Sequence, residues 1–189
     1  VPISLLSFVS FFGPIIGIAL GFDSINGERT QGTLSRLLAQ PIYRDSVFNA
    51  KLIAAAVTLG FIVASVMIVV LGVTMFRLGI PPNGEEVIRL IGFYVVTMMY
   101  LSFWLALSIT ASVLFRNTVT SALASIGAWF TLGFLVNLFG GVIADRIVPD
   151  IKVSADAIKH LTIESWVNRA SPSGLFSEAT TILLDPMGG

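Results

Sequence analysis

The chain has 189 residues, of which 55% are hydrophobic and only 12% are charged, whereas an average soluble domain has roughly 25% charged residues. Eleven basic and eleven acidic residues give no net charge and are scattered, which excludes an electrostatic platform for nucleic acid. The absence of cysteine excludes disulfides and thiolate chemistry, and one histidine is too few for a histidine-based metal centre.

Charge-free runs predict the membrane spans. A hydrocarbon core of about 30 Å requires about 20 apolar residues at a rise of about 1.5 Å each. Four runs of that length occur, at 3–22, 52–76, 90–115 and 119–144, the last two joined by a tight turn around residue 116. Soluble helices would show a polar face with a period near 3.6 residues, but these runs are apolar all round. We therefore predict an all-α polytopic transmembrane bundle, with residues 1–189 forming one domain.

The first span, 3–22, carries a stripe of small residues. Gly13, Gly17 and Gly21 recur at every fourth position, so one face of the helix has no side chains and another helix can approach closely. The pattern predicts a packing seam, either with a neighbouring span or with a second copy of the chain. Pro14 predicts a kink in the same helix. Because the run begins at once from Val1, without a methionine or a charged leader, we expect a fragment of a longer protein.

Alternation of the spans defines two faces. Residues 23–51 and the turn at 116 share one face, and residues 77–89 and 145–189 share the other. The basic residues of the first face are Arg29, Arg36, Arg44, Lys51 and Arg116, and those of the second are Arg77, Arg89, Arg146, Lys152, Lys159 and Arg169. The first group is denser, and this mild positive-inside bias places residues 23–51 in the cytoplasm.

The spans contain polar but no ionisable side chains. This composition disfavours an ion-coupled carrier and an intramembrane enzyme, because both usually need ionisable groups at membrane depth. The remaining polar residues are Thr97, Ser102, Ser108, Thr110, Ser121, Ser125 and Asn137. We expect them to form hydrogen bonds between helices, and the alternative is that some line a substrate path.

The outer segment, 145–189, is predicted to be ordered. Ser154 can cap a helix that runs to about residue 168, and Ser171-Pro172 can open another that continues through Leu184. The segment either lies along the membrane surface, with Trp166 at headgroup level, or packs as a cap on the bundle. His160 and Glu164 have metal-ligand spacing, but no third ligand is evident, so no metal site is predicted.

The polar segment between the first two spans is predicted to form a short amphipathic helix. Residues 28–40 are good helix formers, and Pro41 ends the helix. Its apolar arc consists of Leu34, Leu37 and Leu38, and the other side carries Arg29, Thr33, Arg36 and Gln40. About 13 residues cannot span a bilayer, so the apolar arc must face either the headgroup region or another protein.

The same segment resembles the cytoplasmic segment between the second and third spans of type-2 ABC transporter permeases. The matching residues are, in order, Glu28, Arg29, Gly32, Thr33, Leu34, Leu37, Leu38, Pro41, Arg44 and Lys51. The resemblance implies a six-span permease of which the first and last spans are missing here. It also implies a multi-pass protein of the cell membrane, surrounded by lipid and paired with a second permease copy or half. Two cytoplasmic ATPases would bind ATP and magnesium and drive export, with no cofactor in this chain.

The resemblance also implies a mechanical role for this segment. The helix would sit in a groove of the ATPase, anchored by its leucine arc, while Glu28, Arg29, Arg36 and Arg44 form a charged rim. Gly32 would either allow close backbone approach or mark the start of the helix. No phosphate-binding loop occurs in the sequence, so any ATP site must lie on another chain or domain. The alternative function is a membrane scaffold or assembly protein whose amphipathic segment lies on lipid. The transported substrate is not specified by the sequence.

Overall fold

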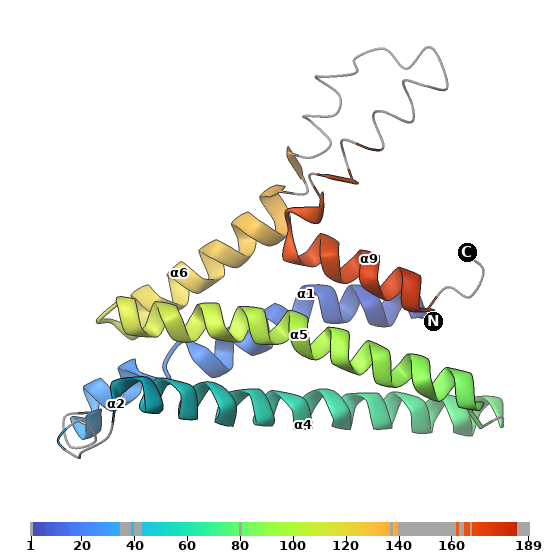
Figure 1. Ribbon diagram of the computed structural model, residues 1–189, viewed down its shortest axis with the longest axis horizontal. Coiled ribbons are helices and arrows are strands. Elements are labelled where there is room, and N and C mark those ends of the chain that lie inside the picture. The colour runs from blue at the N-terminus through green and yellow to red at the C-terminus, as the bar shows by residue number, and fades with distance from the viewer. Residues whose placement is uncertain are drawn as a thin grey trace, which may run out of the picture.

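The computed structural model describes residues 2–34, 39, 43–79, 81–136, 138–139, 162, 165–166 and 168–184. Every regular element within these residues is helical, which confirms the predicted all-α class (Figure 1). The elements are α1 (Pro2–Gly21), α2 (Asn26–Thr30), α4 (Arg44–Leu78), α5 (Gly84–Leu114), α6 (Thr118–Phe130), the π-helical turn η1 (Thr131–Leu135) and α9 (Pro172–Leu184).

Four stretches of helix are long and apolar enough to cross a membrane, as predicted. They are Leu6–Thr30, Asp45–Arg77, Gly84–Leu114 and Thr118–Leu135. The helices α4 and α5 extend beyond the charge-free runs, because a helix continues into the headgroup region wherever no cap or proline stops it. The end of the predicted fourth span, from residue 140 to 144, lies outside the described residues.

The central helix of the bundle is α5, which packs against α1, α4, α6 and α9. Trp104 and Leu59 are fully buried at the core of this packing. The ring of Tyr100 stacks on that of Phe176 from α9, with centroids 4.5 Å apart, and its hydroxyl donates a hydrogen bond of 2.9 Å to the carbonyl of Ser10. Aromatic contacts and this hydrogen bond therefore join α1, α5 and α9.

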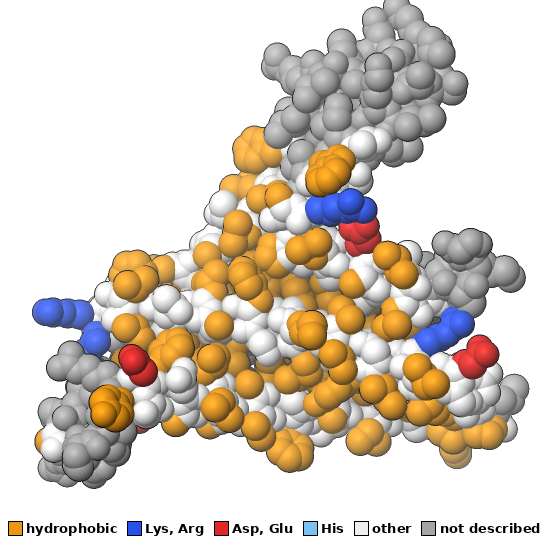
Figure 2. All heavy atoms as spheres, in the orientation of Figure 1, with side chains coloured by type: hydrophobic (Ala, Val, Ile, Leu, Met, Phe, Trp, Pro, Cys, Tyr) orange, Lys and Arg blue, Asp and Glu red, His pale blue; other side chains and the backbone are white. Residues whose placement is uncertain are grey.

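The outward face of α4 is strongly apolar, and Figure 2 shows hydrophobic side chains along the length of the molecule. The large exposed side chains of α4 include Ile53, Val57, Phe61, Ile68, Val69 and Phe76. Such a continuous apolar surface is rare on soluble monomers and suits contact with lipid tails.

The helix bundle has two distinct ends along the helix axes. At one, called here the α2 end, α1 finishes, α2 follows, α4 begins, α5 finishes and α6 begins (Figure 1). The turn predicted around residue 116 lies there, between Leu114 and Thr118, and Asn117 caps α6 by accepting a hydrogen bond of 2.9 Å from the amide of Val119.

At the opposite end, α5 begins with a capping box. The side chain of Asn83 accepts a hydrogen bond from the amide of Glu86, and the Glu86 carboxylate accepts one from the amide of Asn83, both at 2.9 Å. Each bond satisfies an amide that the first helical turn leaves without a partner. The box fixes the first turn of the helix on which the other helices pack.

Removal of this cap is expected to destabilise the protein measurably. The change Asn83→Ala should lower the free energy of unfolding by about 1 kcal/mol, the usual cost of losing an N-cap side chain. Thermal unfolding of the protein in lipid nanodiscs measures the effect. The control is Glu85→Ala in the same turn, which removes only a weak exposed ion pair with Arg89. Equal midpoints for the two variants would show that the capping box is not stabilising.

The α6 helix ends in the π-helical turn η1, which the sequence analysis did not predict. The amide of Val136 donates to the carbonyl of Thr131, the i to i−5 bond that defines this wider turn. The Ser171 hydroxyl donates to the carbonyl of Leu132 at 2.7 Å, and that of Ser173 to the carbonyl of Gly133 at 3.3 Å. Hydroxyls at the start of α9 thus bind the backbone of the π-turn and fix where α9 leaves α6.

Candidate functional site

The first candidate site is the junction at the α2 end, where a short connection joins α1 to α2. The hydroxyl of Ser112, a buried residue in α5, accepts hydrogen bonds from the amides of Ile25 at 3.2 Å and Asn26 at 3.1 Å. Those amides belong to the first turn of α2 and have no partner within the helix. Ser112 therefore attaches the start of α2 to α5.

An ion pair attaches α2 to α4. The Lys51 ammonium lies 2.7 Å from the Glu28 carboxylate and also donates a hydrogen bond of 2.6 Å to the carbonyl of Ser24. Both charged side chains are about one quarter exposed, so water screens the pair less than it would on an open surface. Two charge-assisted bonds from one ammonium hold α2 and the preceding turn on α4.

Hydrogen bonds also attach the junction to α6. The Thr118 hydroxyl donates to the Asp23 carboxylate at 2.9 Å, and the Ser121 hydroxyl donates to the carbonyl of Phe22 at 3.0 Å. Arg29 makes two longer bonds, to the side-chain oxygen of Asn26 at 3.3 Å and to the carbonyl of Phe115 at 3.4 Å. The short α2 helix and the connection that precedes it are therefore joined to three long helices.

Several polar atoms of the junction are buried and lack a hydrogen-bond partner among the described residues. They are the Ser24 hydroxyl, the side-chain nitrogen of Asn26 and the second carboxylate oxygen of Glu28. Buried polar groups are usually paired, because each unpaired one costs about 1–3 kcal/mol. The junction can therefore gain hydrogen bonds if its helices rearrange.

The structure places only part of the predicted coupling segment. The helix predicted over residues 28–40 is interrupted: α2 ends at Thr30, and Gly32 has a φ of 71°, a conformation that favours glycine. Residues 33–34 are helical again, which agrees with the alternative that Gly32 marks a helix start. No atom lies within 4 Å of a Cβ built on Gly32, so no close contact within this chain requires a glycine there. The positive φ is the feature that does. Thr33 and Leu34 are half-buried, and the Thr33 hydroxyl donates to the carbonyl of Glu28.

The other candidate docking residues cannot be placed. Arg36, Leu37, Leu38, Pro41 and the side chain of Arg44 lie outside the described residues. Arg44 is the first residue of α4, so this helix begins within the predicted coupling segment 23–51.

The glycine seam of α1 faces α5 of the same chain. A Cβ on Gly17 would lie 3.1 Å from the carbonyl oxygen of Leu101 and 3.3 Å from the amide nitrogen of Leu105. One on Gly13 would collide with the Leu101 side chain, and one on Gly21 would lie 2.8 Å from the Cβ of Ser108. The seam was predicted to pack either on a neighbouring span or on a second copy of the chain. It packs on the neighbouring span α5, so this face of α1 is not available to a second copy.

Two of the hydroxyls predicted to join helices do so, those of Ser108 and Ser121. The Ser108 hydroxyl donates to the carbonyl of Ile18 at 3.0 Å, next to the glycine seam, and Ser121 reaches α1 in the same way. Ser125 and Thr110 bond to carbonyls of their own helices, and Asn137 lies outside the described residues. Thr97 is buried, and its hydroxyl has no partner in the described part of the chain.

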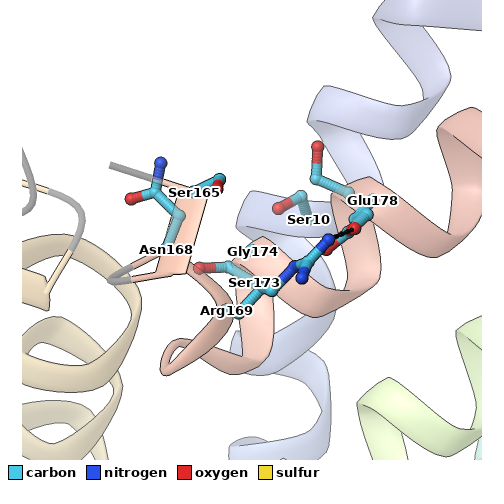
Figure 3. Close-up of a pocket in the computed structure, with 8 residues that line it drawn as sticks. Ser10, Ser165, Asn168, Arg169, Ser173, Gly174 and Glu178 are labelled. Carbon is cyan, nitrogen blue, oxygen red and sulfur yellow. Dashed lines mark hydrogen bonds and ion pairs between the residues drawn. The ribbon is translucent and has the colours of Figure 1, made fainter. Parts of the chain in front are cut away.

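The second candidate site is a pair of adjoining hollows beside α1. One, the polar hollow, lies between α1 and α9 and has a volume of about 620 Å³ (Figure 3). It is lined by Ser10, Ser165, Asn168, Arg169, Ser173, Gly174, Ser177 and Glu178. The other, the aromatic hollow, lies between α1 and α6 and has a volume of about 520 Å³. It is lined by Ser7, Ser10, Phe11, Trp129, Phe130, Gly133, Phe134 and Ser173.

An ion pair forms one wall of the polar hollow. Arg169 precedes α9 and donates two hydrogen bonds to the Glu178 carboxylate, one of them from Nε at 2.8 Å. Paired hydrogen bonds between a guanidinium and a carboxylate are the geometry typical of a strong ion pair. Arg169 also lies over the Trp166 ring, 5.6 Å from its centroid. Sequence reasoning missed this pair because its partners lie nine positions apart and outside the apolar runs.

Groups of three or more His, Cys, Asp or Glu side chains that could hold a metal ion are not found among the described residues. His160 and Glu164 lie outside them. The described residues of both candidate sites offer hydrogen bonds, ion pairs and apolar contacts.

Four helices that are long and apolar enough to span a bilayer define a multi-pass membrane protein. Residues 4–177 match the family model of the ABC-2 family transporter proteins, and the chain belongs to that family. A search of curated proteins found no match. The chain is thus a permease component of an ABC transporter.

Proposed function

We propose that this permease exports a substrate by coupling, through the α2 end, to a separate cytoplasmic ATPase. The observation that carries the proposal is the attachment of α2 to α4 by Lys51 and to α5 by Ser112, and of the connection before α2 to α6 by Thr118. A force applied to α2 would therefore reach α4 and α5 directly, and α6 through that connection. ATP binding on the partner could in this way bias the conformation of a chain that never touches ATP.

The docking surface on this side is the coupling segment. Leu34, Leu37 and Leu38 supply the apolar anchor, and the charged rim of Glu28, Arg29, Arg36 and Arg44 sets register and partner choice. Gly32, Thr33 and Pro41 shape the backbone between them. The density of basic residues supports a cytoplasmic location for this end of the bundle. ATP and magnesium belong to the partner.

A second permease copy, or a paired half, would complete the translocation path. Three exposed aromatic side chains from α1, α6 and η1 line the aromatic hollow, namely Phe11, Phe130 and Phe134. Facing copies would convert this open side into an enclosed path, whereas the glycine seam is already occupied by α5.

Loss of the leucine anchor tests the docking role. Either Leu37→Asp or Leu38→Asp is expected to abolish copurification of the ATPase while the permease still inserts into the membrane, because a carboxylate cannot enter an apolar groove without a large desolvation cost. The measurement is recovery of the ATPase with tagged permease from detergent-solubilised membranes. Gln40→Asp, on the other side of the predicted helix, is the matched control. Unchanged copurification by both leucine variants would contradict ATPase docking and favour the scaffold function.

A further inference from the structure

The polar hollow lies at membrane depth. Ser10, in its wall, is close to the middle of α1, which spans Pro2–Gly21. Tyr100 is close to the middle of α5, and it stacks on Phe176 of α9. The residues of α9 beside Phe176 are therefore level with the middle of two spanning helices, although they come from the predicted outer segment.

A charged pair at this depth indicates that the hollow contains water. The side chains of Arg169 and Glu178 are 46% and 39% exposed. Exposure of these charges to lipid tails would be costly, and charged residues at membrane depth face the protein interior or a water-filled cavity. The eight residues that line the hollow contribute no apolar side chain, which gives water the partners it needs.

The lining also defines the kind of ligand. It contains four serine hydroxyls, the amide of Asn168, and a guanidinium and a carboxylate that neutralise each other (Figure 3). The hydroxyls of Ser165 and Ser173 donate to backbone carbonyls and keep their oxygen atoms as acceptors for a ligand. A site with many hydrogen-bonding groups and no net charge favours a neutral, polyhydroxylated ligand over a free anion or cation. The aromatic hollow shares Ser10 and Ser173 with the polar hollow, and its lining includes four aromatic side chains.

We propose that the polar hollow binds the neutral, polyhydroxylated head group of an amphiphile whose apolar part occupies the aromatic hollow. The inference rests on the proposed function, because this amphiphile would be the transported substrate. A glycoside with an alkyl or aromatic aglycone has this chemistry. The ion pair would bind head-group hydroxyls through its remaining donor and acceptor sites and hold α9 in place.

Cysteine labelling tests water access, because this chain has no cysteine of its own. The Ser177→Cys variant places a thiol in the polar hollow, and Phe61→Cys places one on the exposed face near the middle of α4. The full-length permease, with any other cysteine replaced, is assembled with its ATPase in phosphatidylcholine nanodiscs and treated with a membrane-impermeant sulfonated methanethiosulfonate. The thiol at 177 should react at least about tenfold faster, since the attacking thiolate forms in water. Equal rates would contradict a water-filled hollow.

Protection from labelling tests the ligand class. The probes are decyl maltoside below its micellar concentration, maltose as the head group alone, and decyl phosphate as an anion with the same chain. Decyl maltoside should slow labelling at position 177 more strongly than either other probe and leave position 61 unchanged. Equal protection by decyl phosphate, equal protection by maltose, or no protection would each overturn the assignment.

A paired substitution tests the role of the ion pair. The double variant Arg169→Gln with Glu178→Gln keeps hydrogen-bonding groups and removes both charges. The concentration of decyl maltoside that halves the labelling rate at position 177 should rise about tenfold, because a charge-assisted hydrogen bond to the ligand is lost. An unchanged concentration would exclude the pair from binding. Labelling without a probe shows whether α9 stays in place. Binding is read without ATP hydrolysis, so failure of ATPase docking and failure of this proposal are distinguishable.

Discussion

A Gly21→Val chain is expected to lose the packing of α1 on α5 and to unfold or aggregate in mild detergent. The new Cβ would lie 2.8 Å from the Cβ of Ser108 and 3.0 Å from the carbonyl oxygen of Leu105. Neither atom is the movable end of a long side chain, so the two helix backbones must separate. Overpacking of this kind costs about 1–3 kcal/mol. Separation would also break the bond from Ser108 to the carbonyl of Ile18, which raises the total.

The matched control is Gly72→Val in α4. A Cβ at Gly72 meets no atom within 4 Å, so the same substitution adds no collision and replaces glycine in a helix with a better helix former. Size-exclusion profiles and thermal midpoints in lipid nanodiscs compare the two variants. If Gly21→Val were as monodisperse and as stable as Gly72→Val, close packing of α1 on α5 would be wrong.

The second large effect is expected at the junction. In Lys51→Met, α2 loses its ion pair and the bond to the Ser24 carbonyl, while Glu28 stays partly buried without its partner. The ATPase should still copurify, because the predicted leucine anchor is intact. Hydrolysis of ATP by the complex in lipid should fall about tenfold, the effect of losing one or two charge-assisted bonds at the coupling step.

Two further variants separate coupling from general damage. Arg89→Met breaks an exposed pair with Glu85 at the other end of the bundle and should leave hydrolysis unchanged. Exchange of the charges, Glu28→Lys with Lys51→Glu, should recover part of the activity of those complexes that keep the ATPase, because the pair reforms but the bond to the Ser24 carbonyl does not. Copurification of the ATPase shows whether the rim charge at position 28 affects docking. Full activity of Lys51→Met alone would contradict transmission through this pair.

Hydropathy predicted the features that the thickness and apolarity of the membrane determine, namely the number and positions of the spans. Four charge-free runs became four candidate spans, and the turn at residue 116 and the helix opened by Ser171-Pro172 formed where expected. Partners of a packing face were harder to predict. The glycine stripe in α1 indicated close approach but not the identity of the neighbour, since spacing carries no information about which helix lies opposite.

Two features followed local or tertiary rules that periodicity does not report. Helix propensity over residues 28–40 hid the break at Gly32, although a glycine inside a helical pattern is a recognised signal for a helix end. Alternation of the four spans placed Arg169 and Glu178 in the outer segment 145–189. Phe176 and Ser171 dock α9 on the bundle through Tyr100 and the Leu132 carbonyl, and sequence spacing does not report these contacts.

The most direct test of coupling through the α2 end is an ATP-dependent distance measurement by electron spin resonance on the permease–ATPase complex. Spin labels at Gln31 and Arg116 report on the junction, and labels at Gln31 and Ile182 compare it with α9; all three residues are exposed. When ATP is trapped, the Gln31–Arg116 distance should stay constant while the Gln31–Ile182 distance changes. No change in either distance, or a change only within the junction, would contradict the account.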